Sequence, residues 1–200
     1  MAPEAEKKGL NLIAVWENGY HHITNSKHPI VTPADLKGIK LRVPEGKWRV
    51  KMFQAYGANP SPMKFSEVFT ALQTGVMDGQ ENPFAQIASA KFYEVQKYLS
   101  LTGHVYTPSY VAVGAKKWAG LPADARKIFE DTARETQAWV YDKAARDDDE
   151  LLAKMKTSGI QVNNANKDAF IAASKPVYEE YAKEVPGAKE VIDRAIALGK

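Results

Sequence analysis

The chain has 200 residues, no cysteine, and a net charge of +3 from 27 basic and 24 acidic side chains. Its 44% hydrophobic and 26% charged residues are typical of a folded globular protein and exclude disorder, collagen-like repeats and a disulfide-stapled scaffold. The small charge excess without a long basic run argues against nucleic acid binding, and the lack of cysteine excludes thiolate metal sites.

The first half of the chain alternates short predicted strands and helices. Apolar, β-branched or aromatic stretches predict strands at 10–16, 20–25, 39–43, 76–80 and 105–114. Stretches bounded by glycine or proline predict helices at 2–8, 47–56, 66–74 and 83–90, with a further helical turn or two at 92–98. Strands that alternate with helices predict an α/β fold with some parallel pairing.

One long helix is predicted in the second half. Apolar residues recur from 122 to 157 without an interior glycine or proline, and Pro122 suits the first helical position. A helix of this length would extend about 54 Å, which is more than one small domain needs, so we expect it to span two lobes. A short strand at 160–162 and helices at 168–185 and 188–198 follow, the first broken or kinked at Pro176.

Arg42 is the first residue whose position predicts a chemical role. It lies at the end of the predicted strand 39–43, directly before a Pro-Glu-Gly turn. Ligands of open α/β sheets bind at the carboxyl ends of strands, and a guanidinium offers a planar pair of donors to a carboxylate. The same position also fits an exposed arginine or a structural ion pair.

Asn82 stands directly before Pro83, where a helix is predicted to begin. Asparagine in this place is a common helix N-cap, and its side-chain amide could instead contact a ligand. Taken by themselves, the residues favour the cap.

The histidines and acidic residues do not form a recognisable catalytic or metal motif. No two histidines lie four residues apart on a predicted helix, and His21 and His22 on one strand would point to opposite faces. The acidic run 147–150 would fan out around a helix and predicts a solvated surface. A hydrolase that uses His21 or His104 with Asp78 stays open as an alternative, although no nucleophile motif supports it.

Longer stretches of the chain resemble the solute-binding proteins of TRAP transporters, the DctP-like family of bacterial periplasmic receptors. The stretches are WENGYHHITNSKHPI (16–30), PADLKGIKLRVPEG (33–46), FQAYGANPSPMKFSEVFTALQTGVMDGQENP (53–83), FYEVQKYLSLTGH (92–104) and KKWAGLPADARKIFEDTARE (116–135). The resemblance implies a two-lobed, periplasmic-binding-protein-like α/β fold with a long lobe-spanning helix. Lobe I is expected to be incomplete, because the matched stretches begin in the middle of longer family members.

The resemblance also implies a division of the chain. Residues 1–20 would be a remnant of lobe I with a crossover strand, and 21–104 would form lobe II with the ligand-binding motifs. Residues 105–135 would return to lobe I, and 136–200 would hold the end of the lobe-spanning helix and the C-terminal helices.

Five site residues follow from the resemblance. Arg42 would clamp the ligand carboxylate, Asn82 would orient the same ligand, Phe65 would form an apolar wall, and Glu45 would face the ligand. His21 stands where many family members carry an arginine, so it could donate a hydrogen bond, or it could be a strand residue away from the ligand. Without a second permanent cation at that position, a monocarboxylate is favoured over a dicarboxylate.

The implied function is that of an extracytoplasmic solute receptor. It would bind a small organic acid between two lobes, close by a hinge motion, and deliver the acid to membrane subunits of a TRAP transporter. The resemblance implies no enzymatic activity, cofactor, metal, nucleic acid partner or direct membrane insertion. The full-length parent is expected in the periplasm, although this chain starts without a signal peptide. A sensory ligand-binding domain of the same fold is a further alternative.

Overall fold

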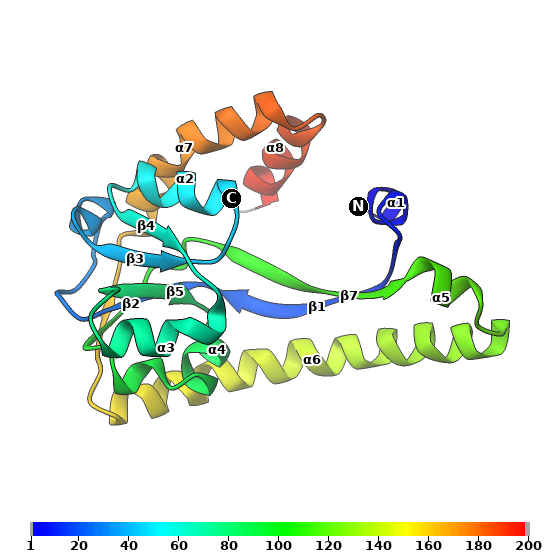
Figure 1. The fold of residues 1–200 in the computed structure, drawn as a ribbon, viewed down its shortest axis with the longest axis horizontal. Coiled ribbons are helices and arrows are strands. Elements are labelled where there is room, and N and C mark those ends of the chain that lie inside the picture. The colour runs from blue at the N-terminus through cyan, green and yellow to red at the C-terminus, as the bar shows by residue number, and fades with distance from the viewer. Residues whose placement is uncertain (1, 199–200) are drawn as a thin grey trace.

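The computed structural model describes residues 2–198, which form a body and a projecting arm (Figure 1). The body is a six-stranded sheet with helices on both faces. The arm contains a two-stranded ribbon, the long helix beneath it and two short helices. Its elements are α1 (Ala2–Lys7), β1 (Leu10–Tyr20), β7 (Tyr106–Gly114), α5 (Ala115–Ala119) and α6 (Ala123–Thr157).

The sheet of the body has the strand order β4-β3-β5-β2-β6-β8. Its strands are β2 (His22–Asn25), β3 (Lys40–Val43), β4 (Asn59–Pro62), β5 (Gly79–Asn82), β6 (Tyr98–Leu101) and β8 (Gln161–Asn164). β3 pairs in parallel with β4 and β5, and β6 with β8, whereas β2 runs antiparallel to β5 and β6. Five strands therefore end at one edge of the sheet, the edge that the ribbon enters. This confirms the predicted α/β class.

An apolar core lies on each face of the sheet. One face is covered by α2 (Lys47–Ala55) and α7 (Lys167–Glu184), and the other by α3 (Phe65–Gln73), α4 (Phe84–Ser89) and the end of α6. The α2 face buries Ile23, Leu41, Val43, Phe53, Tyr56 and Phe170, and the α3 face buries Val68, Leu72, Phe84, Ile87, Leu99 and Met155. The remaining elements are the 3-10 turns at Pro33–Leu36 and Phe92–Glu94 and the helix α8 (Ala188–Leu198).

Three elements differ from the sequence-based expectation. β4 was missed because its sequence, Asn-Pro-Ser-Pro, has no apolar pattern; its two prolines are tolerated since β4 is an edge strand. The helical segment expected at 92–98 is only the turn Phe92–Glu94, and the strand β6 follows. β1 continues through residues 17–19, which lie between the two predicted strands 10–16 and 20–25, with an irregular register between Glu17 and Gly19.

The position of β5 also corrects the expected strand 76–80. The strand begins at Gly79, where a Cβ atom would lie 2.4 Å from the carbonyl oxygen of Thr24. This close approach to β2 requires a glycine, and it sets which of the following residues faces which side of the sheet.

The long helix is confirmed, with 35 residues in α6. α7 runs through Pro176 without ending, so of the break or kink expected there the break is wrong. Within residues 2–198, no helix has the length and apolar content needed to cross a bilayer.

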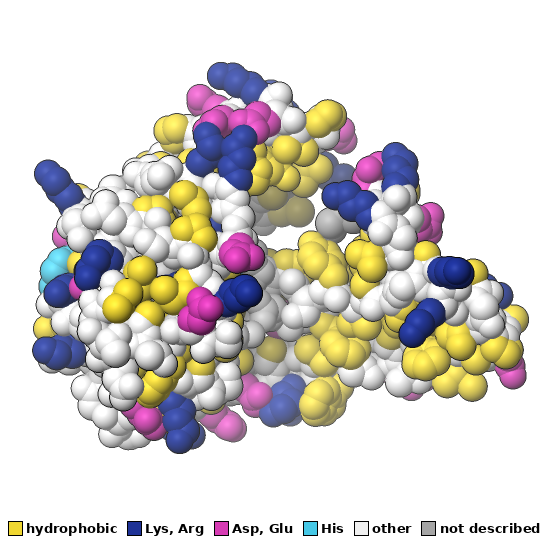
Figure 2. Space-filling model, in the orientation of Figure 1, with side chains coloured by type: hydrophobic (Ala, Val, Ile, Leu, Met, Phe, Trp, Pro, Cys, Tyr) yellow, Lys and Arg dark blue, Asp and Glu magenta, His cyan; other side chains and the backbone are white. Residues whose placement is uncertain are grey.

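Hydrophobic side chains gather over the arm, as Figure 2 shows. On α6, Ile128, Phe129 and Trp139 are more than half exposed. The helix is tied to the ribbon by a hydrogen bond from Trp16 Nε1 to the carbonyl oxygen of Ala133, 3.1 Å long.

Candidate functional site

The carboxyl edge of the sheet carries the residues that the sequence singled out. Arg42 lies near the end of β3, Asn82 ends β5, Phe65 begins α3, and His21 lies between β1 and β2. Glu45 lies in the turn after β3 and is exposed. All five are therefore at the edge of the sheet that the ribbon enters, where the open-sheet rule places ligands.

Strand geometry divides these residues between the two faces of the edge. Arg42 pairs in register with Gln80, and side chains alternate along a strand. Arg42, Gln80 and Asn82 thus face α3, whereas Glu81 faces α2. His21 contacts Glu81, so it belongs to the α2 side and not to the group around Arg42.

Arg42 is a buried cation without a partner carboxylate. Its side chain donates from Nε and Nη2 to the carbonyl oxygen of Met63, at 2.9 and 2.6 Å, and the residue is 3% exposed. No carboxylate within residues 2–198 lies at ion-pair distance from it, so the structure does not support a structural ion pair. Burial lowers the pKa of Arg42, the charge of Glu81 raises it, and the charge of Arg49 lowers it.

Phe65 lies beside this guanidinium. The guanidinium carbon of Arg42 is 6.0 Å from the centre of the Phe65 ring, and the ring packs against Phe92 with centroids 5.6 Å apart. Phe65 remains 43% exposed, so it offers an apolar surface next to a cation.

Asn82 does not cap a helix, which corrects the interpretation favoured by the residues alone. Pro83 occupies the N-cap position of α4. The Asn82 Nδ2 atom instead donates to Oε1 of Gln80 at 2.6 Å, and Gln80 in turn donates to Thr24 at 2.9 Å. The side chains of β5 that face α3 are thus held by hydrogen bonds along and across the strands.

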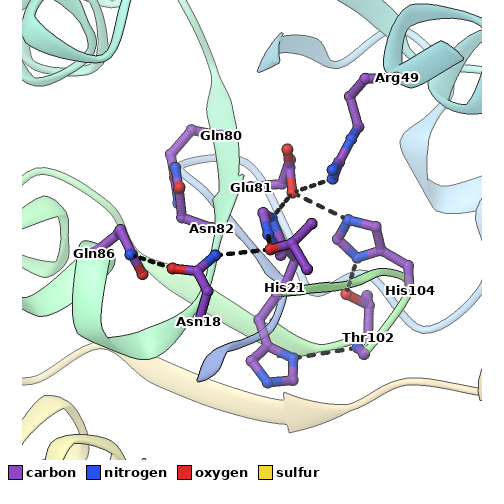
Figure 3. Close-up of polar contacts among 12 residues, drawn as sticks. Asn18, His21, Arg49, Gln80, Glu81, Asn82, Gln86, Thr102 and His104 are labelled. Atoms are coloured by element: carbon purple, nitrogen blue, oxygen red, sulfur yellow. Dashed lines mark hydrogen bonds and ion pairs between the residues drawn. The ribbon is translucent and has the colours of Figure 1, made fainter. Parts of the chain in front are cut away.

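Glu81 is the centre of a cluster on the α2 face, shown in Figure 3. Its Oε2 atom accepts from Arg49 Nη1 at 3.0 Å, contacts Nδ1 of His21, and lies 3.3 Å from Nε2 of His104. Burial alone would raise the pKa of Glu81, but hydrogen bonds from His104 and His21 and the charge of Arg49 lower it to about 2. Glu81 is therefore a fully buried carboxylate that stays ionised.

Both ring nitrogens of His21 are engaged within the protein. Nδ1 contacts Glu81, and Nε2 lies 2.7 Å from Oγ1 of Thr107. Thr107 also accepts from Asn18, which accepts from Gln86 of α4. In this structure His21 joins the ribbon to the sheet edge and is 6% exposed.

The acid that both histidines contact is Glu81, not Asp78 as the hydrolase alternative required. Asp78 accepts from the backbone N–H of Lys40 at 2.9 Å and pairs with Lys27 at 3.2 Å. It stabilises the start of β5 and supplies no acid to the histidines. Among the described residues, no group of three or more histidine, aspartate or glutamate side chains could hold a metal ion.

Sequence reasoning missed Arg49 and Glu81 as partners. A signal for Glu81 was present, because a carboxylate in a short strand between buried residues needs a buried counter-charge. The sequence did not show which cation provides it, since residues 21, 49 and 104 lie on separate elements.

The family model of the bacterial extracellular solute-binding proteins, family 7 (DctP), matches residues 1–184. The chain belongs to this family. The 2,3-diketo-L-gulonate-binding periplasmic protein of Escherichia coli K12 is 39% identical over 189 residues, which cover 94% of this solute-binding chain. The chain spans 58% of the length of that relative.

Two solved structures share the fold of this solute-binding chain. A TRAP periplasmic solute binding protein from Polaromonas sp. JS666, bound to D-erythronate, is 38% identical with a TM-score of 0.88. The match covers 92% of this chain and 61% of the Polaromonas protein. The sugar acid binding protein of Advenella mimigardefordensis, in complex with galactonate, is 34% identical with a TM-score of 0.92. The match covers 98% of this chain and 65% of the Advenella protein. These matches confirm the predicted family and fold class.

Proposed function

We propose that this chain contains the carboxylate-binding edge of an extracytoplasmic receptor for a sugar acid or similar small monocarboxylate. The receptor acts in the periplasm and delivers its ligand to the membrane subunits of a TRAP transporter. One observation carries the proposal: Arg42 is a buried cation that meets no carboxylate in the described chain. A buried charge is costly without a partner, so this position favours an anion.

The neighbours of Arg42 fit a small hydroxylated acid. Asn82 ends the strand beside it and presents an amide that can bind a carboxylate or a hydroxyl group. Phe65 offers an apolar wall, and Glu45 in the following turn is an exposed acceptor for ligand hydroxyl groups. His21 supports this edge from the opposite face through Glu81.

The ligands of three relatives support a single carboxylate. The names of the three relatives cite 2,3-diketo-L-gulonate, D-erythronate and galactonate, each a carbon chain with oxygen substituents and one carboxylate. A binding role needs no catalytic step, and incubation with these acids should yield a bound complex and no product.

The test is isothermal calorimetry of the full-length protein with D-erythronate and galactonate. Arg42→Ala should weaken binding by about 2–5 kcal/mol, because it removes the cation that the ligand carboxylate meets. The control is Arg146→Ala, an exposed arginine of α6, which should bind as the unmodified protein does. Equal affinity in the Arg42→Ala and control proteins would refute the site.

A further inference from the structure

A series of hydrogen-bonded side chains crosses the α3 face and ends at Asn82; we call it the relay. Its members are all buried and are, in order, Gln96, Thr24, Gln80 and Asn82. Gln80 of β5 lies directly opposite Thr24 of β2, and its neighbour in register on the other side is Arg42 of β3. The relay therefore passes beside the strand position that carries the buried guanidinium of the proposed site.

The direction of the relay is fixed at Gln96. Its Nε2 atom donates to two backbone carbonyl oxygens, that of Asp78 at 3.4 Å and that of Val95 at 3.1 Å. A carbonyl oxygen can only accept, so the nitrogen of this amide must face the backbone and its oxygen must face Thr24. The opposite orientation would set the amide oxygen of Gln96 against both carbonyl oxygens.

The direction of every later bond follows from this anchor. Thr24 donates its single hydroxyl hydrogen to Oε1 of Gln96, at 3.1 Å. The Thr24 oxygen can then only accept from Gln80, whose Nε2 atom lies 2.9 Å away. The amide of Gln80 therefore turns its oxygen toward Asn82, which donates to it from Nδ2 at 2.6 Å.

The relay leaves the side-chain oxygen of Asn82 free. Within residues 2–198, no group forms a hydrogen bond with its Oδ1 atom, and only one of the two Nδ2 hydrogens is used. Oδ1 is not enclosed either, because the fully buried side-chain atoms without a partner in the described part of the chain belong to other residues: Glu17, Glu81, Gln86 and His104. Asn82 thus presents a fixed acceptor with a donor beside it.

We infer that the relay makes the site selective for a 2-hydroxy acid, because it orients Asn82 with its oxygen toward the ligand. The inference rests on the proposed function, in which Arg42 meets the ligand carboxylate. The 2-hydroxyl group can donate to Oδ1, and the adjacent carboxylate oxygen can accept the free Nδ2 hydrogen. A 2-deoxy or 2-oxo acid has no hydrogen to donate and leaves the acceptor unpaired. Asn82 touches the ligand, whereas Gln80, Thr24 and Gln96 are positioning residues that act through it.

The first measurement compares acids that differ at one carbon atom. D-erythronate, its 2-deoxy analogue and its 2-deoxy-2-fluoro analogue are titrated into the full-length protein by calorimetry. Loss of the 2-hydroxyl group should weaken binding about tenfold, because a hydrogen bond is lost and Oδ1 of Asn82 stays unpaired. The fluoro analogue should bind no better than the 2-deoxy analogue, since fluorine has nearly the size of a hydroxyl group but donates no hydrogen. Equal affinity for D-erythronate and the fluoro analogue would overturn the inference.

A pair of variants at Thr24 tests whether the relay sets this preference. Thr24→Val keeps the shape of the side chain but removes the hydroxyl group, so the amides of Gln80 and Asn82 can both turn over. The preference for D-erythronate over its 2-deoxy analogue should then fall from about tenfold to about threefold or less. Thr24→Ser retains the hydroxyl group and should retain the preference.

The ratio of two affinities separates orientation from a structural role. A less stable fold would weaken the binding of both acids together and leave their ratio unchanged. The 3-deoxy analogue of D-erythronate is the control ligand, because it keeps the 2-hydroxyl group. Its affinity relative to D-erythronate should be the same in Thr24→Val and Thr24→Ser. An undiminished 2-hydroxyl preference in Thr24→Val would overturn the inference.

A variant at the anchor covers the case in which Thr24→Val does not fold. Gln96→Met removes the amide that fixes the direction, so it should lower the 2-hydroxyl preference in the same way. Glu45, the exposed acceptor in the turn after β3, is the other group that could receive the ligand hydroxyl. A preference that persists in Gln96→Met and disappears in Glu45→Gln would overturn the inference.

The outcome for Arg42→Ala keeps the two proposals apart. Lost binding in Arg42→Ala, together with equal affinity of the unmodified protein for D-erythronate and its 2-deoxy analogue, rejects only the role of the relay. Unchanged binding in Arg42→Ala rejects the proposed site itself.

Discussion

On the α3 face of the sheet edge, Arg42 directs two N–H groups to one carbonyl oxygen and meets no carboxylate within residues 2–198. On the α2 face, one oxygen of Glu81 contacts a guanidinium and two imidazoles. Both charges are buried, but only the second is compensated by the chain itself. The first arrangement suits a ligand that comes and goes, and the second suits a permanent support.

The two arrangements lie only one residue apart along β5. Glu81 faces α2, whereas Gln80 and Asn82 face α3 beside Arg42. Alternation along a single strand thus places a saturated ion cluster on one face of the sheet edge and an uncompensated cation on the other.

The largest expected effect comes from removing the centre of the saturated cluster. Glu81→Ala leaves Arg49, His21 and His104 without their common carboxylate, so the free energy of unfolding should fall by about 3–5 kcal/mol. Urea denaturation at neutral pH measures this change. The exposed Glu130→Gln change on α6 is the control and should stay within about 0.5 kcal/mol. A loss as small as that of the control would mean that the cluster does not support the edge.

A second expected effect is a loss of stability at lower pH that His22 on the α3 face causes. His22, on the α3 face, stacks on Phe84 with ring centroids 4.4 Å apart, and burial is the main cause that lowers its pKa to about 3. The unfolded chain takes up this proton below about pH 6.5 and the folded chain does not, so stability falls as the pH falls. Between about pH 6.5 and pH 4.5, His22 should account for roughly 2–3 kcal/mol of that loss.

Comparison with His22→Gln isolates this contribution, since the variant has no imidazole at that position to titrate. Its stability should decline less steeply over the same pH interval in urea denaturation. Glu81, with a pKa of about 2, loses its stabilising charge only at lower pH and does not disturb the interval. Identical slopes for both proteins would contradict a neutral, buried His22.

The smallest effect is expected on the α3 face, beside Arg42. Phe65→Ala removes the apolar wall beside Arg42, and binding of galactonate should weaken by about 1 kcal/mol. Stability should change little, because the ring is 43% exposed. Val76→Ala, a truncation at a residue that is 55% exposed and lies before the amino end of β5, is the control in calorimetry. If both variants bind equally, Phe65 does not line the site.

Much of the fold could be predicted because local patterns encode it. The apolar strand that carries Arg42 and the uninterrupted helical pattern of α6 need no information from distant residues. The strand β4 could not be predicted, since Asn-Pro-Ser-Pro forms a strand only by pairing with β3.

The candidate site was predicted in part for the same reason. Arg42, Asn82 and Phe65 lie in motifs of consecutive residues, and the structure brings them to one edge. The contacts of Glu81 join residues up to 60 positions apart, and its orientation depends on where the pairing of β5 begins. Gly79 decides that register through a backbone contact that no residue pattern reveals.

Three chain segments cross between the body and the arm: β1, β7 and α6 (Figure 1). A connection made of one or two strands could swivel, whereas three crossings that are fastened to each other oppose torsion. The hydrogen bond from Trp16 to Ala133 fastens the helix to the ribbon. Mechanically, the paired strands and the helix fastened to them act as one connection between the body and the arm. Its softest deformation is bending, and twisting requires the ribbon and the helix to separate.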